Sequence, residues 1–88
     1  MANIRDLKKD INFVLGDIIE AVYTWELLNP GAETKKSEAI IDEAIETFDV
    51  LIAKVSDRKI ENRSAHLKGV SKELEEKGRA LIEKVNKL

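Results

Sequence analysis

The chain of 88 residues is long enough for one folded domain, although a domain of this size has a modest margin of stability. Hydrophobic residues make up 43% and charged residues 36%, which excludes an intrinsically disordered chain and suits long helices with one solvated face. With 15 basic and 17 acidic residues the formal net charge is -2, so no overall positive field draws the protein to nucleic acid or to an anionic membrane.

The side chains that most enzymes and metal sites use are scarce. The chain has no cysteine and a single histidine, which excludes a disulfide framework and a zinc-thiolate site. Ser64 and His66 are two positions apart, so on a helix they point in different directions and form no nucleophile and base pair. Arg63 stands three residues before His66, at the position where di-metal helical bundles carry Glu. We therefore expect a protein without enzymatic activity, cofactor or metal.

The N-terminal segment carries charges where a signal peptide would place its apolar stretch. No run of the sequence approaches the roughly 18 apolar residues of a membrane-spanning helix. We therefore expect a cytoplasmic protein that does not bind a membrane.

Apolar residues at alternating spacings of three and four predict a first helix over residues 3–29, with a coiled-coil-like seam. The seam comprises Ile4, Leu7, Ile11, Val14, Ile18, Ala21, Trp25 and Leu28, with Leu15 and Val22 beside it. Asn29-Pro30-Gly31 ends the helix, because a residue before proline avoids the helical conformation and glycine permits a reversal. The position of Trp25 in this seam predicts that its indole packs in the core.

The remaining sequence predicts two further helices. One spans residues 34–56, after a possible cap at Thr34 or Ser37. Its apolar face comprises Ile40, Ile41, Ala44, Ile45, Phe48, Leu51, Ile52 and Val55. The other spans residues 62–87. Two rows with a seven-residue repeat run along this part of the sequence, one of large residues (Ile60, Leu67, Leu74, Leu81, Leu88) and one of mostly small residues (Ser64, Ser71, Gly78, Val85).

Short connections between long helices favour antiparallel neighbours, so the sequence predicts an all-α, up-down-up antiparallel three-helix bundle. The bundle forms a single domain over residues 1–88. Small residues in a seam let a neighbouring helix or a bulky side chain approach closely, and we expect Gly78 to lie opposite Trp25.

The first helix carries a second apolar stripe on the side away from its seam. The stripe consists of Phe13, Gly16, Ile19, Glu20, Tyr23 and Leu27. A small rotation of the helix could instead bury Ile19 and Tyr23 in the same core. We interpret the stripe as an interface in which this helix packs on its counterpart in a second copy, with Gly16 allowing close approach. The expected function is that of a small interaction or scaffolding protein that forms a homodimer.

Two alternatives remain. In the first, the protein is a monomeric adaptor that docks a helix of another protein on Phe13, Tyr23 and Leu27. In the second, basic residues around the connection between the second and third helices bind an anion or a nucleic-acid backbone; they are Arg58, Lys59, Arg63, His66 and Lys68. Nucleic acid is the less favoured partner, because this segment has no interleaved aromatic residues and no glycine-rich phosphate loop.

Overall fold

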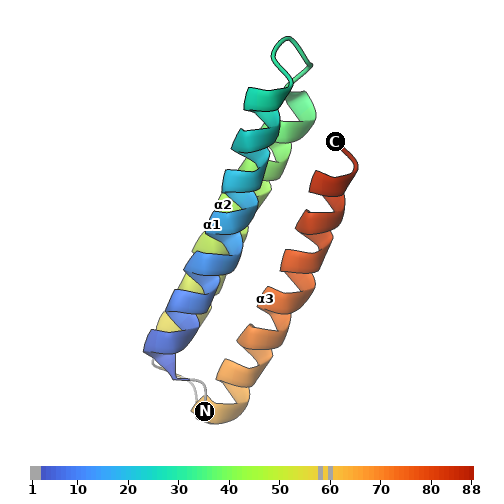
Figure 1. Cartoon of the computed structure of the whole chain (residues 1–88). Helices are drawn as coiled ribbons and strands as arrows, with labels where there is room; N and C mark the ends of the chain where they lie inside the picture. The colour runs from blue at the N-terminus through green and yellow to red at the C-terminus, as the bar shows by residue number, and fades with distance from the viewer. Residues whose placement is uncertain (1–2, 58, 60) are drawn as a thin grey trace.

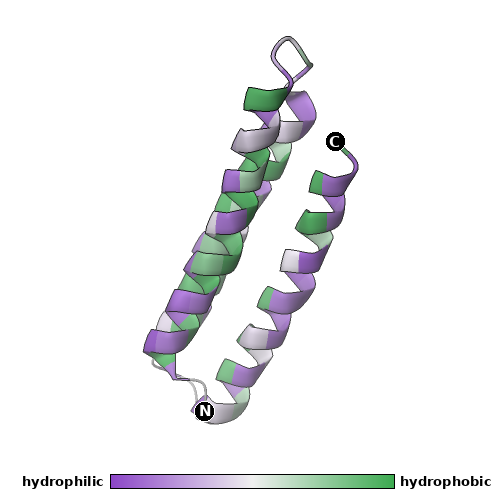
Figure 2. Ribbon diagram, viewed as in Figure 1, coloured by the Kyte–Doolittle hydropathy of each residue, from purple (hydrophilic) through white to green (hydrophobic). Residues whose placement is uncertain are grey.

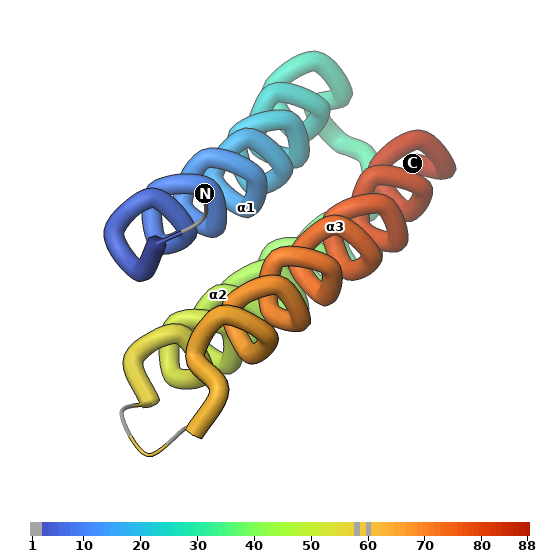
Figure 3. The backbone as a smooth tube through the Cα atoms, turned by 90° about the horizontal axis from the view of Figure 1, so that it is seen from below, coloured from blue at the N-terminus to red at the C-terminus, as the bar shows by residue number. Residues whose placement is uncertain are grey.

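A computed structural model describes residues 3–57, 59 and 61–88 of the chain. It forms three helices, α1 (Ile4–Leu28), α2 (Lys35–Ser56) and α3 (Arg63–Asn86), and each helix contacts the other two. Figures 1 and 3 show that α2 runs opposite to α1 and that α3 returns in the direction of α1. The up-down-up three-helix bundle predicted from the sequence is confirmed, and it forms a narrow body of 50 × 20 × 17 Å.

Side chains and one glycine fix the ends of the helices within one residue of the predicted bounds. The Asn3 side chain accepts a hydrogen bond from the backbone N–H of Asp6 at the start of α1, at 2.8 Å. Past the end of α1, Gly31 adopts a φ of 87°, a conformation that glycine reaches without steric cost. At the start of α2 the hydroxyl of Ser37 donates to the Thr34 carbonyl oxygen, while the Thr34 side chain makes no capping bond.

The core lies along the line where the three helices meet, and Figure 2 shows the hydrophobic side of α3 turned towards α1 and α2. On α1 the buried residues are Leu7, Ile11, Leu15, Ile18 and Val22. The predicted seam is therefore wrong at Ala21 and Leu28, which are exposed. A strict heptad row drifts by about 20° per heptad around a straight helix, so it leaves the core along α1. The row through Leu15 and Val22 replaces it.

The helices α1 and α3 approach each other closely at Gly78 and Val14. A Cβ atom built on Gly78 would lie 3.1 Å from Cγ1 of Val14, so the absent side chain makes room for this valine. The predicted pairing of Gly78 with Trp25 is wrong. Trp25 instead lies at the end of α1, in a hollow that Lys87 and Leu88 also line, beyond the level of Gly78 along α3.

Two ion pairs connect α2 with α3 on the outside of the bundle. Lys54 contacts Glu73 at 2.8 Å, and Lys84 contacts Glu43. All four side chains are partly exposed, so each pair contributes at most about 1 kcal/mol to stability. They mark the flank of α2 that faces α3.

Candidate interaction surface

Three large hydrophobic side chains are exposed on α1, on the side opposite the core. Phe13 is 69% exposed, Tyr23 is 53% exposed and Leu27 is 81% exposed. Gly16 and Glu20 are exposed between them. Steps of three and four residues along α1 connect all five, so they lie on one helix face. We call this set the outer face of α1.

Ile19 marks the edge of this face rather than its centre. It is half-buried and packs against the core, whereas Tyr23 stays exposed. The rotated-helix alternative therefore holds for Ile19 and is wrong for Tyr23.

The neighbouring helix α2 adds one residue that the sequence pattern had placed in the core. Ile45 is 48% exposed. The flank of α2 that carries Glu43 and Lys54 faces α3, so the other flank, with half-buried Phe48 and Ile52, faces α1. Ile45 lies next to these two residues at helical spacing and continues their flank outwards. Ile45 therefore adds an exposed apolar side chain on the flank of α2 that faces α1.

Charged side chains flank the apolar part of the outer face. Lys9 precedes Phe13 by four residues, and Glu20 follows Gly16 by four. Both are exposed, and neither forms an ion pair within residues 3–57, 59 and 61–88. A Cβ built on Gly16 would meet nothing within 4 Å, so the space above Gly16 is open. Gly16 lies between Lys9 and Glu20 along α1.

The structure describes four of the five residues of the predicted basic cluster. Lys59 lies in the segment between α2 and α3, Arg63 opens α3, and Arg58 lies outside the described residues. His66 and Lys68 are two positions apart on α3, so they point to nearly opposite sides of this helix.

His66 has a structural role that the sequence did not indicate. Its Nε2 lies 2.7 Å from the Lys54 carbonyl oxygen, and this nitrogen donates because a carbonyl oxygen can only accept. Lys54 lies in the last turn of α2, where carbonyl groups have no partner within the helix, and its oxygen also accepts a longer hydrogen bond, 3.3 Å, from the backbone N–H of Asp57. The imidazole therefore caps α2 from α3.

We expect His66→Ala to lower the free energy of unfolding by about 0.5–1.5 kcal/mol, because the capping hydrogen bond is lost. Urea denaturation followed by circular dichroism measures this loss. Lys68→Ala is the matched control, since this exposed side chain makes no ion pair in the described part of the chain. Equal unfolding midpoints for the two variants would contradict the capping role.

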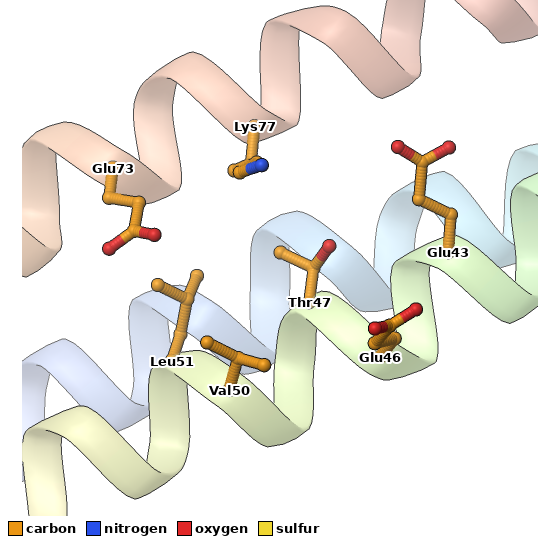
Figure 4. A pocket seen from close by; sticks show the side chains of 7 residues that line it. All are labelled: Glu43, Glu46, Thr47, Val50, Leu51, Glu73 and Lys77. Carbon is orange, nitrogen blue, oxygen red and sulfur yellow. The ribbon is translucent and has the colours of Figure 1, made fainter.

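A hollow of about 220 Å³ lies between α2 and α3 and has Glu43, Glu46 and Glu73 on its walls. Figure 4 shows these side chains. Lys77 and the hydrophobic Val50 also line the hollow. Over the described residues, no group of three or more histidine and acidic side chains is placed to hold a metal ion. Two of its three glutamates, Glu73 and Glu43, are paired with Lys54 and Lys84, so the hollow has little excess negative charge.

Among the helices described, none is long and apolar enough to cross a membrane. Comparison of the chain with family models, with curated proteins and with solved structures finds no match.

Proposed function

We propose that this chain is a small interaction protein without enzymatic activity that self-associates through the outer face of α1. The observation that supports the proposal is the exposure of Phe13, Tyr23 and Leu27 on one helix face. The core is complete without them, since α1 already buries five other residues against α2 and α3. Large exposed apolar patches typically mark interaction sites.

The order of side chains on this face suits an antiparallel pairing of α1 with α1 of a second copy. A two-fold axis midway between Phe13 and Gly16 brings Phe13 of each copy against Gly16 of the other. The same axis brings Lys9 of each copy against Glu20 of the other. In such an isologous interface every contact occurs twice, so one aromatic contact and one ion pair become two of each.

The area of one helix face limits the strength of this contact. Stable protein interfaces bury about 1,200–2,000 Å² in total, and a single pair of helices lies at the lower end of that range. We therefore expect a dimer that dissociates on dilution.

Light scattering over a concentration series tests the proposal. We expect the wild type to approach twice the monomer mass and Phe13→Glu to remain at the monomer mass, because a buried unpaired carboxylate is strongly unfavourable. Tyr23→Glu should also weaken the dimer, because the same axis places residue 23 of each copy opposite Asp6 of the other and so brings like charges together. Val50→Glu is the control, because it places the same charge on an exposed apolar position of α2, on the flank towards α3.

Charge reversal tests the antiparallel pairing itself. Lys9→Glu and Glu20→Lys should each weaken the dimer, because each places like charges opposite one another. The double variant should restore it. A wild type that stays monomeric at all concentrations would rule out self-association and leave the outer face to a helix of another protein. Dimers without rescue by the double variant would rule out this register.

A further inference from the structure

The end of the bundle that holds the connection between α1 and α2 contains two adjoining hollows. One has a volume of about 300 Å³ and the other about 460 Å³. They share Lys36, Lys87 and Leu88 on their walls, and we call the two adjoining hollows together the end hollow. Pockets for small molecules have volumes of about 300–1,000 Å³, so the end hollow is large enough for one.

Apolar side chains from all three helical segments line the end hollow. Trp25 comes from α1, Ile40 from α2, and Leu88 follows α3. Ile40 belongs to the buried core and lines the smaller hollow, while Leu88 is half-buried against the core and lines both. Trp25 is half-buried and lies outside the set of hydrophobic residues that pack on the core. Its indole is therefore available to a molecule in the hollow.

Lysines surround this apolar lining. The walls carry four lysines and two glutamates, Glu33 and Glu43. The lysines are Lys35, Lys36, Lys84 and Lys87. Lys84 is paired with a wall glutamate, and Lys35 lies 3.9 Å from the other. Lys36 and Lys87 form no ion pair within the described ranges. The side chains that line the end hollow therefore carry an excess of positive charge, in a chain whose formal net charge is -2.

An apolar lining beneath free ammonium groups complements a molecule with an apolar tail and one negative charge. We propose that the end hollow binds a single-chain fatty carboxylate. The alkyl tail lies over Trp25, Ile40 and Leu88, and the carboxylate lies between Lys36 and Lys87. Apolar contact supplies affinity in such a site, and the few polar groups fix the orientation of the ligand. This binding is independent of self-association, because the residues differ from those of the outer face of α1.

Intrinsic fluorescence tests the proposal, because Trp25 is the only tryptophan of the chain. The full chain is titrated with octanoate and with decanoate, both below their critical micelle concentrations. We expect a saturable change in Trp25 emission, with decanoate binding up to about 15-fold more tightly, since each buried methylene contributes about fourfold. We expect acetate to cause no change and 1-octanol to bind at least tenfold more weakly than octanoate.

Two charge-reversal variants provide the matched comparison. Lys36→Glu with Lys87→Glu should weaken decanoate binding at least tenfold, whereas Lys68→Glu with Lys72→Glu makes the same change of net charge on α3 and should leave it within twofold. Phe13→Glu should also leave it within twofold, which excludes binding to the outer face of α1. An emission change that does not saturate, equal affinity for octanoate and 1-octanol, or equal loss in both lysine pairs would overturn the proposal. If a lysine variant does not fold, the difference in affinity between octanoate and decanoate for the wild type still tests the proposal.

Discussion

Leu15→Ala is expected to lower the free energy of unfolding by about 2–5 kcal/mol, and Leu28→Ala by less than about 0.5 kcal/mol. Both variants remove the same atoms from the same helix, and they differ in the surroundings of the side chain. Leu15 is 1% exposed within the core, whereas Leu28 is 75% exposed at the end of α1. Only the first substitution loses buried contacts and leaves a cavity.

Urea denaturation of the two variants measures the difference. Domains of this kind have a total stability of about 5–15 kcal/mol, so the loss at Leu15 is a large fraction of the whole. The slope of the unfolding free energy against urea should stay constant, because the surface exposed on unfolding hardly changes. Similar losses at the two positions would mean that α1 packs through its strict heptad row, and this outcome would contradict the observed rotation of the helix.

The second large effect concerns the glycines of α3. Gly78→Leu is expected to lower the free energy of unfolding by about 1–3 kcal/mol, because the added side chain collides with Val14 and overpacks the core. The same substitution at Gly69 is expected to raise it by up to about 1 kcal/mol, because leucine favours a helix more than glycine does. A Cβ on Gly69 meets nothing within 4 Å. The two variants should therefore shift the unfolding midpoint in opposite directions.

A second substitution isolates the contact between the two helices. Val14→Ala removes the methyl groups nearest to Gly78, so it should recover part of the loss caused by Gly78→Leu. A coupling energy between the two sites, obtained from the double-mutant cycle, distinguishes direct contact from independent effects. If Gly78→Leu stabilised the protein as Gly69→Leu does, the close approach of α1 and α3 would be refuted.

The fold could be predicted from the sequence because each helix carries its own signal. Apolar spacings of three and four identify the three helices, and Asn29-Pro30-Gly31 separates the first two. These signals are local, and the observed ends agree with them within one residue. Exposure of Phe13 and Tyr23 was predictable for the same reason, because the apolar seam leaves them on the far side of the helix.

The mutual register of the helices could not be read from these patterns. Two adjacent rows on α1 are both apolar, and only packing against α2 and α3 decides in favour of Leu15 and Val22. Whether Gly78 lies opposite Val14 depends on how far α3 is shifted along α1. Similarly, Lys36 and Lys87 are far apart in the chain, and the end hollow exists only because the end of α3 returns to the start of α2.

An odd number of antiparallel helices separates the two ends of the described chain. Residues 3 and 88 lie towards opposite ends of a body 50 Å long, as Figure 1 shows. Partners joined to these two ends would be held apart by a stiff rod, whereas an even number of helices would bring them to the same side. A bundle of this shape would therefore keep two attached segments at opposite ends of its long axis.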